Sequence, residues 1–333
     1  SSVRILEHEF KFFKKYLGVF MKPVIPVFFA TDNNYAPFVT VTLESILENC
    51  SKDYFYHFHI LTTDLDKKYE EVITKYESED VKIEFISLKT ILTKIKVKFH
   101  LRDYYSIETY YRFFIANMYP QYDKVLYMDC DIVCLGDIAE LYNTDITNLF
   151  LAASPEEVMA EVKVFGDYVE KALDVPVNEY FNAGIMVMNL AEFRKENIED
   201  KFFKMINRFR FRVTQDEDYL NVLCKGKTKI LDLGWNKTAF KNDKFDDKNL
   251  KLVHYKINWK PWKHKNILYE DLFWKYAAKT EFYDMIKQKF EDYTDEQRAK
   301  DIVAYENLVQ MAIDDMNDPY NYKNMMAKEK ESK

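Results

Sequence analysis

The sequence predicts an α/β fold in which a mixed, mainly parallel β-sheet carries helices on its faces. Two observations lead to this prediction. Short runs of β-branched and aromatic residues alternate with segments of helical apolar spacing through roughly the first 190 residues, which is the pattern of βαβ units. One apolar run also ends in two aspartates, and ligands bind to such sheets beyond the carboxyl ends of their strands.

Strands and helices are expected to alternate up to the acidic segment. The strands are apolar runs rich in Val, Ile and aromatic residues, at 24–30, 55–62, 81–88 and 123–128. The helices have apolar residues three and four positions apart, at 37–49, 67–77 and 107–118. Pro120 follows the last of them, because proline cannot continue a helix.

The domain organisation is expected to be simple, because the chain has no internal repeat and no Gly/Ser-rich linker. A single catalytic domain is expected at 21–264. Residues 1–20 are expected to form an N-terminal extension of helical apolar spacing, since Lys22, Pro23 and Pro26 interrupt the apolar run that a secretory signal would need. Residues 265–333 are expected to form a C-terminal helical appendage that ends in a polar tail.

Composition excludes several classes of protein. The chain is 48% hydrophobic and 31% charged, as in ordinary globular proteins, and its net charge of −7 argues against nucleic-acid binding. The sequence contains no apolar run of about 18 residues, the length that a helix needs to span a bilayer. The four cysteines form no C-x-x-C motif, which indicates reduced thiols. We therefore expect a cytoplasmic protein. The basic and aromatic residues after His254 leave open a peripheral contact with the inner face of a membrane or an amphipathic helix that covers the domain.

Glycine is scarce, since only 6 of the 333 residues are glycine, against an average of roughly 7%. Neither G-x-G-x-x-G nor G-x-x-x-x-G-K-[ST] occurs. A phosphate group would therefore not be held in a glycine-rich loop. Another source of positive charge would be needed.

The most informative segment is the strand at 124–133, KVLYMDCDIV, which delivers Asp129 and Asp131 at its carboxyl end. Residues i and i+2 of an extended chain point the same way, so the two carboxylates converge. A hard divalent cation such as Mn²⁺ or Mg²⁺ relieves their repulsion and also bridges diphosphates. A plain turn of aspartates is the alternative. A phosphatase of the haloacid-dehalogenase type is disfavoured, because βα units precede Asp129 and no Gly-Asp motif with further carboxylates follows.

At this point the chain resembles glycosyltransferase family 8, the group that includes bacterial lipopolysaccharide galactosyl- and glucosyltransferases and glycogenin. The resemblance is carried by six motifs in the family's order. They are FFATDNNYAP at 28–37, TYYRF at 109–113, the D-x-D at 129–131, YFNAGIMVMNL at 180–190, DEDYLN at 216–221 and HYKINWKPW at 254–262. The resemblance implies a GT-A type nucleotide-diphospho-sugar transferase fold.

The family's site residues carry over onto these motifs. The resemblance implies that uracil and ribose contact Ala30, Asp32 and Asn34, that the metal binds Asp129, Asp131 and His254, and that the phosphates contact Lys260. It further implies that the donor sugar is surrounded by Arg112, Asn182, Ala183 and Asp216, with Glu217 closest to the anomeric carbon. Asp216 and Glu217 are accordingly the catalytic candidates.

The implied function is that of a retaining, Mn²⁺-dependent (or Mg²⁺-dependent) hexosyltransferase. It would move glucose or galactose from UDP-glucose or UDP-galactose to a glycan or lipid-linked acceptor. The metal and a lysine would stabilise the charge that develops on the UDP leaving group. A sugar-nucleotide-binding protein without transfer activity remains the alternative.

Two positions depart from the family pattern. Glu217 replaces a family Gln, and Thr214-x-x-Glu217 also forms a capping box, so its role is either structural or an added charge beside the sugar. Ile257 replaces a family Gly, and a β-branched residue disfavours positive φ and blocks close backbone approach. Isolated histidines are usually structural, so His57, His59 and His100 are assigned no role.

Overall fold

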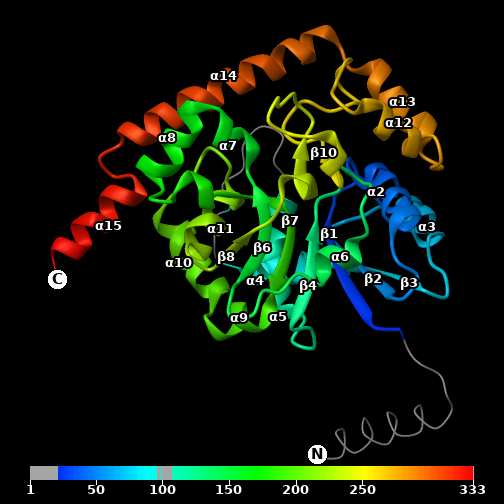
Figure 1. Ribbon diagram of the computed structural model, residues 1–333, viewed down its shortest axis with the longest axis horizontal. Coiled ribbons are helices and arrows are strands. Elements are labelled where there is room, and N and C mark those ends of the chain that lie inside the picture. Colours follow the sequence, from blue (N-terminus) through cyan, green and yellow to red (C-terminus); the bar gives the residue numbers. More distant parts are fainter. Residues whose placement is uncertain (1–21, 96–98, 100–106, 333) are drawn as a thin grey trace, which may run out of the picture.

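A seven-stranded sheet forms the centre of the molecule, within residues 22–95, 99 and 107–332, which the computed structural model describes (Figure 1). Its strand order is β3-β2-β1-β4-β7-β6-β8. The strands are β1 (Val24–Ala30), β2 (Phe55–Thr62), β3 (Val81–Ser87), β4 (Lys124–Met128), β6 (Leu151–Pro155), β7 (Phe181–Asn189) and β8 (Thr228–Ile230). β1, β2, β3 and β4 are parallel, while β7 runs antiparallel to both neighbours. The expected mixed, mainly parallel sheet is confirmed.

Helices cover both faces of this sheet. The helices are α2 (Ala36–Asn49), α3 (Lys67–Thr74), α4 (Lys89–Lys94), α5 (Ile115–Met118), α6 (Ile138–Tyr142), α7 (Glu157–Glu161), α8 (Lys163–Ala172), α9 (Leu190–Lys195), α10 (Ile198–Arg208), α11 (Asp216–Cys224), α12 (Glu270–Ala277), α13 (Tyr283–Asp292), α14 (Asp295–Asn317) and α15 (Tyr322–Glu331). Short 3₁₀ helices join them, η1 (Ile107–Phe113), η2 (Val177–Glu179), η3 (Leu233–Asn236) and η4 (Asp247–Asn249).

The core lies in two layers, one on each face of the sheet. In β1, Val27 and Phe29 face the layer that α2, α3 and α12 close, whereas Phe28 between them faces the layer of α8 to α11. This alternation follows from the two-residue period of a strand. Because both faces are covered, β1 is apolar throughout rather than alternately polar.

A second, three-stranded sheet stands beside the first, with the order β5-β10-β9. Its strands are β5 (Ile132–Cys134), β10 (Leu252–His254) and β9 (Lys237–Thr238). In the antiparallel pairing of β5 with β10, His254 lies opposite Ile132. Segments about 120 residues apart in sequence are thereby brought together immediately after the acidic strand end.

The C-terminal helices pack on the rest of the molecule rather than standing apart. α12 buries Phe273 and Tyr276 against the layer that contains α2. α14 then passes over the molecule and reaches α8, where Leu308 and Ala312 are buried (Figure 1). None of the helices in the described ranges is long and apolar enough to cross a membrane.

Two sequence predictions need comment. The single helix expected at 107–118 is wrong in detail, because the segment forms η1 and then the short helix α5. Arg112 Nε donates to the Thr109 carbonyl oxygen at 2.9 Å, an acceptor that a regular α-helix gives to the backbone four residues on. The extension expected at 1–20 lies outside the described residues.

Candidate active site

A cleft opens beyond the carboxyl ends of β1 and β4, with about 1110 Å³ of empty space including the part open to solvent. Most of the residues that the sequence singles out lie on its wall. These are Ala30, Asp32, Arg112, Asp129, Asp131, Asn182, Asp216, Glu217, His254 and Lys260. Asn34 and Ala183 lie beside the wall rather than on it. Asn34 is exposed and donates to Asp32, and Ala183 is buried in β7.

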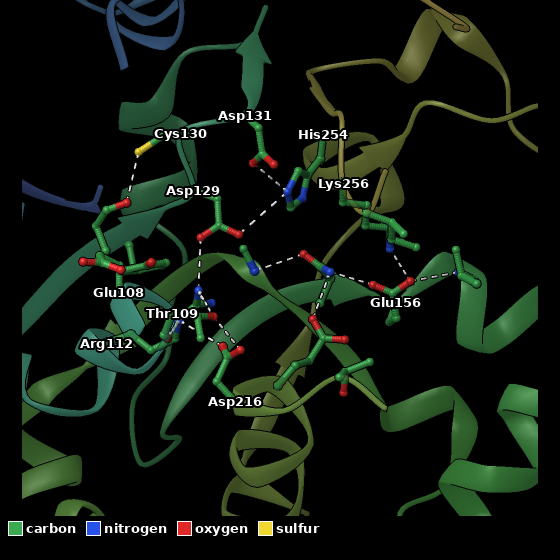
Figure 2. A pocket seen from close by; sticks show the side chains of 18 of the residues that line it. Glu108, Thr109, Arg112, Asp129, Cys130, Asp131, Glu156, Asp216, His254 and Lys256 are labelled. Atoms are coloured by element: carbon green, nitrogen blue, oxygen red, sulfur yellow. Dashed lines mark hydrogen bonds and ion pairs between the residues drawn. The ribbon is translucent and has the colours of Figure 1, made fainter. Parts of the chain in front are cut away.

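Asp129, Asp131 and His254 converge in the cleft (Figure 2). His254 Nε2 lies 3.1 Å from Asp131 Oδ1 and 3.7 Å from Asp129 Oδ2, and all ligand atoms of the three lie within 4.8 Å of one another. The pairing of β5 with β10 sets this arrangement, since the backbone N–H of Tyr255 donates to the Asp131 carbonyl at 2.9 Å. Two carboxylates and one imidazole form a donor set that suits a divalent cation.

Gly184 in β7 has no side chain, and the space that a side chain would fill is occupied by His254 and Asp129. A β-carbon at position 184 would lie 2.4 Å from His254 Cε1 and 2.6 Å from Asp129 Oδ2. Real β-carbons do not approach other atoms so closely, so any side chain here would displace the ligands. The glycine is therefore required by the carboxylate–imidazole group above it.

Asn236 determines which nitrogen of His254 faces the two carboxylates. Its Nδ2 donates to Asn182 Oδ1 at 2.8 Å, so its Oδ1, 2.9 Å from His254 Nδ1, is the acceptor for an Nδ1–H. The neutral imidazole then presents the Nε2 lone pair to the cleft. Such a partner fixes the tautomer of a metal-binding histidine. The residues present therefore fit a metal ion.

Lys260 places a buried positive charge beside Asp131. Its buried Nζ forms an ion pair with Asp131 Oδ2 and donates to the Tyr255 carbonyl at 2.7 Å. Burial alone would lower the pKa of Lys260, but Asp131 raises it above its usual value. Burial alone would raise the pKa of Asp131, but Lys260 and His254 hold it well below its usual range. Both groups are charged at neutral pH.

Arg112 lies between Asp129 and Asp216 and forms an ion pair with each carboxylate. Its guanidinium contacts Asp129 Oδ1 at 3.1 Å and Asp216 Oδ2 at 3.3 Å, and it lies over the ring of Tyr127. Thr109 Oγ1 donates to the other oxygen of Asp216 at 2.5 Å. Burial raises the pKa of Asp216 to about 6, with Arg112 opposing the rise. Asp216 is therefore ionised at pH 7 despite its burial.

Glu217 does not form the capping box with Thr214 that the sequence allowed. Its Oε2 accepts hydrogen bonds from Asn182 Nδ2 at 2.9 Å and from the Ala183 backbone N–H at 2.8 Å. The backbone N–H of Thr214 is instead satisfied by Asp218 Oδ2 at 3.0 Å. The capping box is thus excluded, and the Glu217 side chain is turned into the cleft.

Glu156 and Lys256 complete this acidic end of the cleft and are missed by sequence reasoning. Glu156 accepts from Asn182 Nδ2 at 2.6 Å and forms an ion pair with Lys256 (Figure 2). Burial, and then the charge of Glu156, raise the pKa of Glu217 well above its usual value. Lys256 lowers the pKa of Glu156 in spite of burial. A signal was present, because Glu156 follows directly on the apolar strand β6, as Asp129 follows β4.

Ile257 adopts the backbone conformation that its side chain disfavours. Its φ is +58°, in the left-handed region, and its side chain lines the cleft. For a β-branched residue this conformation is a genuine outlier. The position therefore has the geometry of a glycine, and the departure from the family pattern lies in the side chain alone.

Apolar side chains also line the cleft. They are Val158, Met159, Phe165, Val213 and Leu308. Leu308 belongs to α14, so the C-terminal helices contribute directly to the cleft. Charged, polar and apolar side chains are thus joined in the wall of one cavity.

Comparison with known proteins agrees with this geometry. The family model described as "Glycosyl transferase family 8" matches residues 26–266. A Haemophilus influenzae protein described as a glycosyltransferase is 31% identical over 242 residues, covering 69% of this chain and 68% of its own length. A lipopolysaccharide 1,2-glucosyltransferase of Escherichia coli is 28% identical over 254 residues, covering 69% and 71%.

Among solved structures, the apo form of the bifunctional glycosyltransferase WbbM superposes with a TM-score of 0.71 at 25% identity. The match covers 82% of this chain and 52% of that one. The expected GT-A type fold is confirmed. Since the family model spans most of the chain, including all six motifs, this protein belongs to glycosyl transferase family 8.

Proposed function

We propose that this chain is a retaining hexosyltransferase that moves glucose or galactose from a UDP-sugar to a glycan or lipid-linked acceptor. The proposal is carried by one observation. A carboxylate–imidazole group, a buried ammonium that contacts it and a set of buried carboxylates line a single cleft. Cations suit the diphosphate of a nucleotide sugar, and carboxylates suit its hydroxyl groups and a positively charged transition state.

In this proposal Asp129, Asp131 and His254 hold Mn²⁺ or Mg²⁺, which would neutralise charge on the diphosphate when bound. Lys260 adds a second positive charge from the protein. It is buried, and its contacts with Asp131 and the Tyr255 carbonyl hold its ammonium in one position, so it is preorganised for an anion. Ala30, Asp32 and Asn34 hold the nucleoside. Asp32 Oδ1 accepts from the N–H of Tyr35 at 2.9 Å, so Asp32 also holds the loop that leads into α2, although no side chain of the described residues caps that helix.

The donor sugar lies against Arg112, Asn182, Ala183 and the two candidate catalytic acids in this proposal. Asp216, with its pKa of about 6, contributes a negative charge at neutral pH. Glu217, with its raised pKa, contributes a hydrogen-bonding group that holds Asn182 and Ala183 in place. The apolar side chains of the same wall, with Leu308, would receive the acceptor.

The test is metal-dependent release of UDP. The full chain is incubated with UDP-glucose, UDP-galactose or UDP-N-acetylglucosamine, with Mn²⁺, with Mg²⁺ and with chelator. We expect turnover of UDP-glucose or UDP-galactose that needs the metal and is lost in Asp131→Asn. Binding of UDP without any release of UDP from these donors, with or without a glycan acceptor, would favour the alternative of a binding protein without transfer activity.

Peripheral contact with a membrane also stays a proposal. Several aromatic side chains after His254 are buried, including Trp262 and Phe273, whereas Trp259 is 38% exposed. Flotation of the full chain with anionic vesicles tests the contact, and Trp259→Ser tests whether this side chain carries it. Equal flotation of both variants would assign the contact to another surface.

A further inference from the structure

A second cluster of metal-binding side chains lies in the sheet, away from the residues that line the cleft. His57 and His59 stand two positions apart in β2, and Glu84 lies in the adjacent strand β3, opposite His59. His57 Nε2 is 3.3 Å and His59 Nδ1 is 3.4 Å from the same carboxylate oxygen, Glu84 Oε2. The three ligand atoms lie within 4.8 Å of one another. A His-x-His pair in a strand was the only sign of this cluster in the sequence.

Tyr122 holds the far side of both rings. Its hydroxyl oxygen is 3.1 Å from His57 Nδ1 and 3.2 Å from His59 Nε2. His59 is 1% exposed and His57 15% exposed, and burial disfavours the charged form of an imidazole. Each neutral ring has one N–H and one lone pair.

Counting protons shows that this arrangement is incomplete. Tyr122 has a single hydroxyl proton, so it can donate to one ring only, and the other ring must use its N–H toward Tyr122. At least one ring therefore directs a lone pair at the carboxylate of Glu84. Among the described residues, His57 Nε2 and His59 Nδ1 also have no partner with hydrogen-bond geometry. His59 is only 1% exposed, so bulk water does not satisfy its nitrogen. A cation between the rings and the carboxylate would remove this conflict.

The spacing identifies the kind of cation. Bonds of about 2.0–2.1 Å to a tetrahedral Zn²⁺ place neighbouring ligand atoms about 3.3–3.4 Å apart. Both measured N···O distances lie in this range. Two imidazoles and one carboxylate suit Zn²⁺, whereas the two carboxylates and single imidazole of the cleft suit a harder ion. Glu84 is 47% exposed, so solvent can reach the cluster and a water molecule can be the fourth ligand. Lys82, on the same face of β3, is exposed, and its charge opposes a cation at this position.

We propose that His57, His59 and Glu84 bind a zinc ion that links β2 to β3. Tyr122 would orient both imidazoles from behind, as outer partners of metal-binding histidines do. The site is independent of the proposed transfer reaction, because none of its residues lines the cleft.

The experiment measures zinc per chain. The full chain carries Asp129→Asn and Asp131→Asn, so that the cleft cannot bind the metal through these carboxylates. It is stripped with chelator, equilibrated with Zn²⁺, desalted and analysed by mass spectrometry. We expect one zinc per chain, and a tetrahedral visible spectrum when Co²⁺ replaces it. In this background Glu84→Gln and His57→Gln should lose the zinc, while the exposed neighbour Glu79→Gln retains it.

Both test positions are at least partly exposed, so these variants are expected to fold, which circular dichroism verifies. His59→Ala is avoided because His59 stacks on Phe28 at 4.5 Å in the core. Absence of zinc from the background protein, or undiminished zinc in folded Glu84→Gln and His57→Gln, would overturn the proposal. Turnover of a UDP-sugar should be unchanged by Glu84→Gln alone, so failure of this site and failure of the proposed function are distinguishable.

Discussion

Gly184 lies directly against the imidazole of His254, so closely that a β-carbon at position 184 would come within 2.4 Å of Cε1. This contact links strand β7 of the main sheet to β10 of the small sheet, which ends at His254. Gly184 is therefore needed because there is no room for a side chain. Its backbone conformation does not require glycine, since among the glycines of the described residues the positive φ is found at Gly226.

Gly184→Ala should therefore remove metal binding while the fold is kept. The added methyl must displace His254 or Asp129, and an ångström of misplacement costs on the order of 100-fold in rate. We expect at least this loss of metal-dependent turnover and a much weaker affinity for Mn²⁺ by titration calorimetry. Gly226→Asn is the matched control, because that position is open and its φ of +71° suits asparagine. Wild-type metal affinity in Gly184→Ala would contradict the assignment of the site.

Glu217→Gln and Asp216→Asn should differ sharply. The raised pKa of Glu217 favours its neutral acid, and a glutamine oxygen can accept from the same two donors, Asn182 and Ala183. We expect turnover within about tenfold of the parent and a higher melting temperature, since the folded parent must hold a proton on this buried carboxyl that the unfolded chain releases at pH 7. Asp216→Asn removes the partner of Arg112 and a negative charge, and should lose about 100-fold or more in kcat. Equal losses in the two variants, measured at saturating donor, would contradict these distinct roles.

Ile257→Gly should be unusually well tolerated for a large-to-small change. Releasing a left-handed isoleucine recovers about 1–2 kcal/mol, which offsets the lost side-chain packing and the flexibility of glycine in the unfolded chain. We expect a free energy of unfolding within about 1 kcal/mol of the parent, and several-fold tighter binding of UDP because the backbone becomes accessible.

Ile185→Ala, in the core of β7, provides the contrast for Ile257→Gly and should cost about 2–5 kcal/mol. Urea denaturation and calorimetry with UDP measure these quantities. A loss above about 2 kcal/mol in Ile257→Gly would show that packing of this side chain outweighs the strain.

Stability should depend on pH through Glu199. Burial raises the pKa of Glu199 to about 7, although Asn117 donates to its carboxylate at 2.9 Å. Between pH 4.5 and 7 the folded chain holds a proton that the unfolded chain has released, so stability falls as pH rises through this interval. Glu199→Gln should be more stable than the parent at pH 8, by on the order of 1 kcal/mol because the side chain keeps some hydration, and about equal to it at pH 4.

Urea denaturation at the two pH values tests this, with the exposed Glu179→Gln as the control. If Glu199→Gln gains the same stability at pH 4 as at pH 8, the effect does not arise from titration of this carboxyl group.

The amino-acid sequence by itself determined the sheet, the order of its first four strands along the chain and the pair of carboxylates, Asp129 and Asp131, at the end of β4. These features are local, because strand periodicity, helical spacing and an acidic strand end all lie within a few residues of one another. The identity of Asp129, Asp131, His254 and Lys260 as one group came from motif order, and the structure places them together.

Only the tertiary structure decided what those residues touch. Asn236, Glu156 and Lys256 take part through contacts between segments 18 to 100 residues apart, which no local pattern encodes. The same holds for Glu217, whose capping alternative was excluded by where β7 lies, and for Leu308, which α14 carries back to the cleft. The His57–His59–Glu84 cluster likewise depends on the register of β2 against β3, because a shift of one residue would turn Glu84 to the opposite face.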